Sequence, residues 1–169
     1  MSALPPSVTL RTATEEDRPF LLRLFASTRE PELEAAGMPR EQWPPFLGQQ
    51  FEAQSRHYAT YEATSFEVVQ VDGEPAGRLI VARWPEELRV VDVSLLPEYR
   101  GRGIGGSLLS WLIEEADQRG VKTSIHVERF NPAQRLYARL GFRKAADDGS
   151  LYLLFERPPA AAGQEKTAS

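Results

Sequence analysis

The sequence lacks cysteine altogether and has only two histidines, His57 and His126. A chain without thiols can form no disulfide, no thiolate nucleophile and no cysteine-ligated zinc site. Two histidines are also too few for a multi-histidine metal centre. We therefore expect a protein that works without a bound metal.

Basic residues are fewer than acidic ones, with 20 Lys and Arg against 24 Asp and Glu, which gives a formal net charge of -4. This balance provides no general attraction to nucleic-acid phosphates or anionic lipid, so we expect neither a nucleic acid nor a membrane as partner. Long apolar runs are missing too. None approaches the roughly 20 residues that span a bilayer, and residues 1–6 lack the basic and apolar parts of a signal peptide. These features predict a cytoplasmic protein.

What the sequence does contain is enough apolar material for one core. Of its 169 residues, 41% are hydrophobic and 26% are charged, which is typical of a globular domain. Residues 158–169 are rich in alanine and polar side chains, with too few large apolar ones to pack. We expect one domain over residues 1–157 and a disordered tail over residues 158–169.

Local patterns predict helices and strands along this domain. Asp72-Gly73 is a strong signal for a tight turn between two strands, and the composition of residues 31–45 favours an irregular connection. Apolar positions at spacings of three and four predict helices that bury one face. The expected helices span residues 14–29, 46–62, 104–119 and 132–140, and the expected strands span residues 8–11, 66–71, 77–82, 88–96, 122–127, 142–144 and 151–156.

A glycine-rich loop follows the strand at 88–96 and leads into a helix. Its G-x-G-x-x-G pattern permits positive φ angles and lets backbone N–H groups approach a ligand, while the N-terminus of the next helix favours an anion. Two arginines within the loop supply charge-assisted donors for phosphate oxygens. The residues expected to surround a diphosphate are Arg100, Gly101, Arg102, Gly103, Ile104, Gly105 and Gly106.

Three other interpretations fit this loop less well. A plain turn would not need two arginines beside four glycines. A dinucleotide site uses the same glycine pattern and expects an acidic residue about 20 positions on, which Glu128 nearly satisfies. However, the loop lies in mid-chain, residues 97–100 separate it from the strand, and the neighbouring elements form hairpins instead of repeated βαβ units. A P-loop would require Gly-Lys-Ser/Thr after the glycines.

Two segments, residues 93–105 (VSLLPEYRGRGIG) and residues 131–142, form recognisable motifs. The first resembles the coenzyme A signature of the GNAT superfamily of N-acetyltransferases, whose (Q/R)-x-x-G-x-(G/A) core is met by Arg100, Gly103 and Gly105. Residues 131–142 (NPAQRLYARLGF) resemble its second signature. The resemblance covers nearly all of the chain except the tail. It implies a single α/β domain of mixed α+β type, with a central, mostly antiparallel twisted sheet of about six or seven strands and about four flanking helices.

The resemblance also implies acetyl-CoA as acyl donor and a primary amine as acceptor. Backbone groups of Val93, Ser94 and Leu95 would pair with pantetheine like an added strand, while the loop amides hold the diphosphate. Asn131 is similar to an asparagine that contacts the cofactor arm. Direct transfer in a ternary complex then requires a neutral amine, a donor for the oxyanion and an acid for the departing thiolate.

Tyr137 is the candidate acid, because it occupies the tyrosine position of the second signature. A thiol has a pKa of about 8.5 and a phenol of about 10, so a phenol held close can protonate the thiolate. The alternative is a half-buried structural tyrosine. Three residues are alternative bases: strand alternation sends His126 and Glu128 to one face, and Asp92 projects similarly from the neighbouring strand.

Several functional questions stay open at this level. A protein N-terminus, lysine, polyamine, amino acid or antibiotic would fit as acceptor, and related domains commonly pair through late strands, which is compatible with a homodimer. Trp43 and Phe46 would line either the acceptor pocket or a core between two helices. A non-catalytic acyl-CoA sensor and, less favoured, a dinucleotide-binding oxidoreductase are the competing functions.

Overall fold

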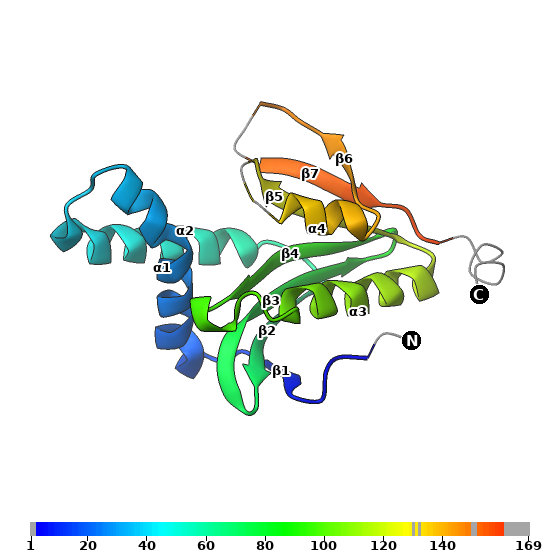
Figure 1. The fold of residues 1–169 in the computed structure, drawn as a ribbon, viewed down its shortest axis with the longest axis horizontal. Coiled ribbons are helices and arrows are strands. Elements are labelled where there is room, and N and C mark those ends of the chain that lie inside the picture. Colours follow the sequence, from blue (N-terminus) through cyan, green and yellow to red (C-terminus); the bar gives the residue numbers. More distant parts are fainter. Residues whose placement is uncertain (1–2, 130, 132, 150–151, 161–169) are drawn as a thin grey trace.

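The computed structural model describes residues 3–129, 131, 133–149 and 152–160. A seven-stranded sheet forms its centre, with the strand order β1-β2-β3-β4-β5-β7-β6 (Figure 1). The strands are β1 (Val8–Thr12), β2 (Thr64–Val71), β3 (Glu74–Trp84), β4 (Glu87–Leu95), β5 (Lys122–Glu128), β6 (Arg143–Ala146) and β7 (Tyr152–Arg157). The helices are α1 (Arg18–Ala35), α2 (Trp43–Tyr58), α3 (Ile104–Arg119) and α4 (Gln134–Arg139), with short 3-10 turns at Glu15–Asp17, Arg40–Gln42 and Pro97–Tyr99.

The sheet is antiparallel except at its middle. Strands β1 to β4 form an antiparallel meander, β5 lies parallel to β4, and β7 and β6 continue the sheet with antiparallel pairing. The turn between β2 and β3 has φ angles of 51° at Asp72 and 81° at Gly73, in the left-handed region that Asp-Gly turns favour. The predicted mixed architecture with a mostly antiparallel sheet is confirmed.

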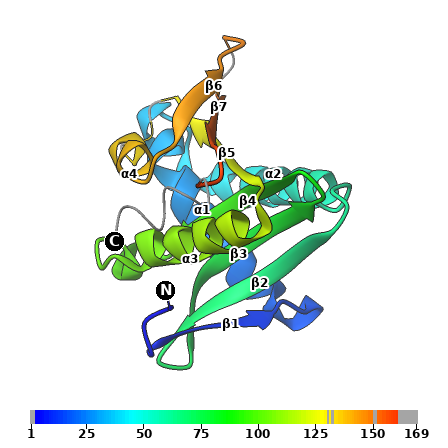
Figure 2. The same ribbon diagram turned by 90° about the vertical axis from the view of Figure 1, so that its right-hand side faces the viewer.

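Helices cover both faces of this sheet. In Figure 2, α3 crosses the front of the sheet, whereas α1 and α2 lie behind it. The larger core lies on the α3 side, where Leu108 and Leu112 are fully buried in one cluster with Val90 of β4. A smaller cluster on the other face joins Leu24 of α1 to Val68 of β2. Because helices cover both faces, every residue of β3 from Ala76 to Ala82 is buried.

Helix α1 is longer than the sequence predicted. The predicted helix ended at residue 29 and was followed by an irregular connection over residues 31–45, whereas α1 continues through Pro31 to Ala35. A proline inside a helix removes one backbone hydrogen bond and costs about 3 kcal/mol. Leu33, beyond the proline, is 8% exposed and packs in a core cluster. The burial of Leu33 offsets part of that free-energy cost. Helix propensity depends on the local sequence alone and therefore does not predict this burial.

Helices α1 and α2 share a small core of their own. Trp43 is 6% exposed in this cluster, and its Nε1 donates to the Met38 carbonyl oxygen at 2.9 Å. Phe46 packs partly buried against the same cluster. Of the two interpretations of Trp43, the structure shows the helix core. Helix α2 spans residues 43–58 instead of the predicted 46–62, because the two prolines after Trp43 fit the first turn, where N–H groups have no helical partner.

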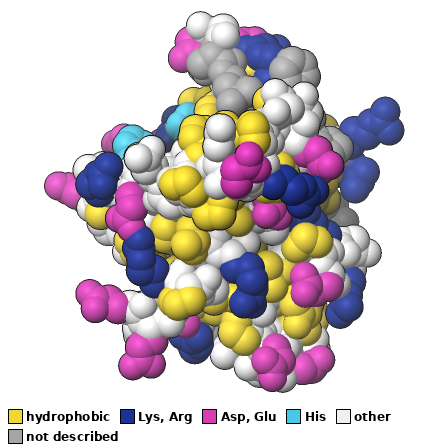
Figure 3. Space-filling model, turned by 90° about the vertical axis from the view of Figure 1, so that its left-hand side faces the viewer, with side chains coloured by type: hydrophobic (Ala, Val, Ile, Leu, Met, Phe, Trp, Pro, Cys, Tyr) yellow, Lys and Arg dark blue, Asp and Glu magenta, His cyan; other side chains and the backbone are white. Residues whose placement is uncertain are grey.

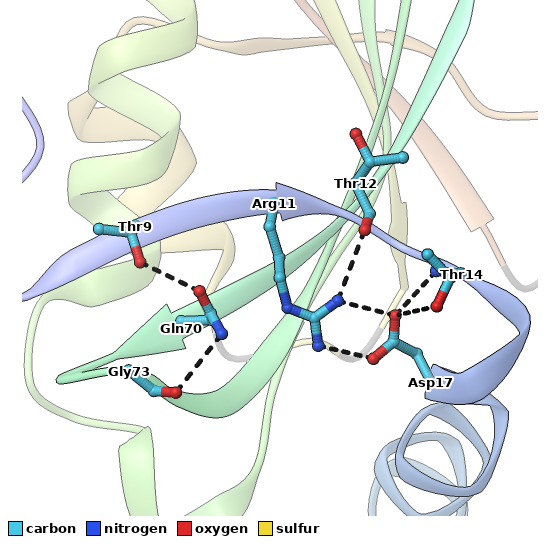
Figure 4. A network of polar contacts seen from close by, with 7 residues as sticks. All are labelled: Thr9, Arg11, Thr12, Thr14, Asp17, Gln70 and Gly73. Carbon is cyan, nitrogen blue, oxygen red and sulfur yellow. Dashed lines mark hydrogen bonds and ion pairs between the residues drawn. The ribbon is translucent and has the colours of Figure 1, made fainter.

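A network of hydrogen bonds stabilises the start of α1 (Figure 4). Arg11 Nη2 donates to Asp17 Oδ1 at 2.6 Å and Nη1 to Oδ2 at 2.9 Å, while the Thr14 N–H donates to Oδ2 at 2.8 Å. These bonds, above all those from Arg11, lower the pKa of Asp17 to about 2. The predicted helix start at Thr14 is instead a 3-10 turn over Glu15–Asp17, immediately before α1.

The chain beyond β7 lies against α3. Asp117 Oδ1 accepts hydrogen bonds from Arg157 Nη1 at 2.7 Å and from the Ala160 N–H at 3.0 Å. The bond from Ala160 connects the first described residues beyond β7 to α3. Residues 161–169 lie outside the described residues.

Charged side chains of both signs lie on the surface of the molecule. Figure 3 looks onto the left-hand side of Figure 1, and there acidic and basic side chains alternate with small apolar patches. Among the residues that the structure describes, no helix combines the length and the apolar character that crossing a membrane requires.

Candidate active site

Strands β4 and β5 pair only along their first halves. Their shared register ends at Val90 and Ile125. Val91 forms a bulge in β4, because its neighbours Val90 and Asp92 pair with consecutive residues of β3. A bulge bends a strand and interrupts its pairing, so β4 runs on to Leu95 without pairing to β5.

Beyond Val90, the edge of β4 that faces β5 has no strand partner among the described residues, and we call it the free edge of β4. The Leu96 N–H donates to a β3 carbonyl at 2.8 Å, and alternate residues of a strand turn their backbone groups to the same side. The groups of Ser94 therefore face β3, where an added Cβ at Gly77 would lie 2.2 Å from the Ser94 oxygen. The groups of Val93 and Leu95 face the opposite side, toward the gap beside β5.

The glycine loop lies between the end of β4 and the start of α3. Gly101 and Gly103 have φ angles of 74° and 78°, in the left-handed region that favours glycine. Within the described part of the chain, the N–H groups of residues 101–106 donate to no acceptor, and the first bond of the helix start runs from the Ser107 N–H to the Gly103 oxygen at 3.0 Å. A Cβ at Gly101, Gly103 or Gly105 would meet no heavy atom within 4 Å. A run of free donors thus opens outward at the positive end of α3, an arrangement that binds anions.

The loop arginines and Asn131 have contacts of their own. Arg100 Nε donates to the last carbonyl of β4 at 2.9 Å, and the Arg102 guanidinium lies 5.3 Å from the ring centroid of Tyr99. Asn131 Oδ1 accepts from the Ala133 N–H at 2.8 Å. The structure therefore places the two arginines beside the loop and Asn131 at the turn that begins α4.

Tyr137 lies in the core on α4 and is 6% exposed. Its ring packs edge-on against Phe142 at a centroid distance of 6.2 Å. Its hydroxyl makes no hydrogen bond within the part of the chain that the structure describes. Burial raises the pKa of Tyr137, and the Asp92 carboxylate raises it further, so the phenol is protonated at neutral pH. The neighbouring Leu136 approaches within 3.8 Å of a Cβ built at Gly106, which places α4 against the start of α3.

Two of the base candidates are paired with arginines. Asp92 Oδ2 accepts from Arg78 Nε at 2.8 Å and also from Arg78 Nη2, and its side chain is 19% exposed. Glu128 Oε1 accepts from Arg29 Nη1 at 2.9 Å. Burial lowers the pKa of Arg29, but hydrogen bonds to Glu128 and Tyr152 raise it more. Arg29 therefore ties α1 to β5 and to β7.

The third base candidate, His126, has different surroundings. It is exposed on β5, and burial of part of the ring together with Arg89 lowers its pKa. Glu87 and Asp148 are its acidic neighbours. The structure brings Asp92 within electrostatic reach of Tyr137, and it surrounds His126 with charges from the paired end of β4.

Two residues that the sequence analysis did not single out, Tyr58 and Arg78, lie near Asp92. Tyr58 ends α2, and burial raises its pKa, with Asp92 adding to the rise and Arg78 opposing it. The Arg78 guanidinium lies 5.7 Å from the Tyr58 ring centroid, and Arg78 Nη2 donates to Gln54 Oε1 at 2.9 Å. The one signal in the sequence was a charged residue inside an otherwise apolar strand, Arg78 within residues 77–82.

Comparisons with known proteins identify similar acetyltransferases. Residues 32–142 match the model of the acetyltransferase (GNAT) family. The chain is 33% identical over 95 residues to streptothricin acetyltransferase of Streptomyces lavendulae. The aligned region covers 54% of this chain and 50% of that protein. The chain is 35% identical over 60 residues to a ribosomal-protein alanine N-acetyltransferase of Haemophilus influenzae, covering 35% of this chain and 41% of that one. The chain thus spans about half the length of the curated relatives it matches.

The fold is likewise similar to that of solved acetyltransferases. The PaiA N-acetyltransferase of Thermoplasma acidophilum, solved in complex with coenzyme A, superposes with a TM-score of 0.62 at 20% identity, covering 90% of this chain and 99% of that one. At this identity the likeness concerns the fold. The family model spans well over half of the sequence, including the glycine loop and Tyr137. The chain belongs to the acetyltransferase (GNAT) family.

Proposed function

We propose that this protein is an acetyl-CoA-dependent N-acetyltransferase that moves the acetyl group directly to a primary amine in a ternary complex. The observation that carries the proposal is the run of N–H groups at residues 101–106, which have no acceptor among the described residues and follow the part of β4 that does not pair with β5. A diphosphate and an amide-bearing arm joined to it are the two parts of coenzyme A that these features would bind.

The residues present fit such a donor. The loop offers consecutive amides at a helix N-terminus, with open space above its glycines, and this suits a diphosphate. Val93 and Leu95 turn backbone groups toward the gap, and an extended chain with amides of its own would pair with them as a strand does. Arg102 adds positive charge on the exposed side of the loop.

The transfer step requires one acid and one base. The amine nitrogen attacks the thioester carbonyl carbon, the C–S bond breaks, and the thiolate takes a proton from the Tyr137 hydroxyl. The amine loses a proton to the base, and that proton returns to Tyr137 through water. The Tyr137 hydroxyl suits this role because it is protonated at neutral pH and has no competing partner in the described part of the chain.

Asp92 is the base that the geometry favours among the three candidates. It lies where β4 leaves β5, and it interacts electrostatically with both Tyr137 and Tyr58. Arg78 engages only its Oδ2. Asp92→Asn is expected to lower kcat with the Kd for coenzyme A nearly unchanged, whereas His126→Ala should leave kcat close to the wild-type value. If His126→Ala lowers kcat and Asp92→Asn does not, the base is His126.

The experiment that tests the proposal measures binding and turnover separately. Calorimetry with coenzyme A reports on the loop, and thiol release from acetyl-CoA with a panel of amines reports on transfer. We expect binding of coenzyme A and thiol release with at least one amine. Binding without turnover on a broad panel would favour an acyl-CoA sensor, and protection by NAD in place of coenzyme A would favour an oxidoreductase.

The acceptor is proposed as a class only. Streptothricin acetyltransferase and the ribosomal-protein alanine N-acetyltransferase, both similar to parts of this chain, suggest two arms of the amine panel: a basic antibiotic and a peptide with a free N-terminal alanine. A homodimer and a cytoplasmic location stay predictions from the sequence, to be checked by light scattering and by localisation of the full chain.

A further inference from the structure

The side chain of Arg100 turns back from the glycine loop to the strand that precedes it. Its Nε donates to the Leu95 carbonyl oxygen at 2.9 Å. Its Nη2 also lies 3.4 Å from Ser27 Oγ on α1. One guanidinium thus joins three parts of the molecule: the end of β4, the start of the loop and helix α1.

The bond from Arg100 is significant because of the direction in which the Leu95 carbonyl points. By strand alternation, the backbone groups of Leu95 face the gap beside β5, as those of Val93 do. The Leu95 carbonyl is therefore the last acceptor on the free edge of β4. Arg100 occupies it and leaves the Val93 groups and the Leu95 N–H for a strand-like ligand.

We propose that Arg100 is a positioning residue, which fixes the glycine loop relative to the free edge of β4 and does not act as a phosphate ligand. This inference rests on the proposed function, because it concerns how the two anchoring points of acetyl-CoA are kept at a set distance. With that distance fixed, a diphosphate bound at residues 101–106 places the thioester in a single position near Tyr137. A misplacement of about 1 Å at the reacting atoms is enough to lower a rate about 100-fold.

Conservative variants separate positioning from charge. In glutamine, the side-chain amide nitrogen is the same number of bonds from Cα as the arginine Nε, so Arg100→Gln keeps a donor for the Leu95 carbonyl and removes the positive charge. Arg100→Lys keeps the charge but has a methylene group at that position. Positioning therefore predicts that Gln substitutes better than Lys, and phosphate contact predicts the reverse.

The expected kinetics follow from these variants. For Arg100→Lys and Arg100→Ala, the KM for acetyl-CoA should rise about three- to tenfold, and kcat should fall as well, because the thioester is less well placed. For Arg100→Gln, both constants should stay within about twofold of the wild type. Ser27→Ala should have a smaller effect than Arg100→Ala, because its contact is longer. Arg143→Ala, which replaces an exposed arginine on β6, is the control for the loss of one positive charge.

A readout without coenzyme A distinguishes failure of this inference from failure of the proposed function. In the ligand-free protein, the Arg100 Nε–H should give an NMR signal protected from solvent exchange, and the Gly101 amide signal should move in Arg100→Lys but little in Arg100→Gln. Recovery of KM and kcat by Lys but not by Gln, or an unprotected Nε–H, would overturn the positioning role. Lack of coenzyme A binding by the wild type, with the Nε–H protected, would overturn the proposed function alone.

Discussion

Replacing Gly103 with alanine should reveal how much the loop depends on its left-handed backbone. Gly103 has a φ of 78° and caps the N-terminus of α3. A Cβ there meets no heavy atom within 4 Å, so steric crowding by neighbours adds nothing. The cost is the backbone conformation itself, about 1–2 kcal/mol for a residue with a Cβ.

That strain can appear in either of two measurements. If the Gly103→Ala variant keeps the left-handed conformation, the free energy of unfolding falls by about 1–2 kcal/mol. If the loop relaxes, the N–H groups turn away, and coenzyme A must restore them on binding, so its Kd rises about 5- to 30-fold. The two losses should add up to about the same total.

Gly105→Ala is the matched control, since it adds the same methyl group two residues later. Gly105 has ordinary helical geometry and equally open surroundings. Its replacement should raise the free energy of unfolding by about 0.5–1 kcal/mol. Urea denaturation and calorimetry with coenzyme A measure both quantities. Gly103→Ala with unchanged stability and unchanged affinity would refute the role given to the positive φ.

Four further substitutions test the acid role of Tyr137 and the stability of the fold. Tyr137→Phe should lower kcat at least about 100-fold, in line with loss of a general acid, while the Kd for coenzyme A stays within about twofold; unchanged turnover would exclude the acid role. Thr123→Val should raise the free energy of unfolding by about 1 kcal/mol, because the buried Thr123 hydroxyl has no partner in the described part of the chain. Thr28→Val, whose wild-type hydroxyl donates to the Phe25 carbonyl at 2.7 Å, should lower it instead. Asp17→Asn should cost about 1–2 kcal/mol at pH 7. The folded-state pKa of about 2 lies below the ordinary 3.8, so this difference should be full above about pH 4 and vanish as the pH falls through about 2.

The sequence predicted those parts of the fold that depend on neighbours in the chain. Asp72-Gly73 specifies its turn by backbone chemistry alone, and the glycine loop indicates its positive φ angles in the same way. The extension of α1 through Pro31 was not predictable from propensity, because the burial of Leu33 against α2 opposes the local preference. The length of α1 therefore depends on tertiary packing.

Candidate site residues could be named from the sequence mainly along the two signatures. Residues 100–106 and Tyr137 could be named because each lies in a recognisable motif. Tyr58 has no such motif, and Arg78 was marked only as a charge inside an apolar strand. Both reach Asp92 because α2 and β3 come together from distant parts of the chain. The divergence of β4 from β5 likewise depends on the bulge at Val91, where the register between β3 and β4 shifts by one residue. No residue type in the sequence indicates this bulge.

An NMR titration of the backbone amides with coenzyme A shows directly whether the glycine loop binds the diphosphate. We expect the amide proton signals of residues 101–106 to move downfield together as their N–H groups acquire diphosphate oxygens as acceptors, with smaller shifts at Val93 and Leu95. Saturating coenzyme A that leaves the signals of residues 101–106 in place, while perturbing others, would contradict the account.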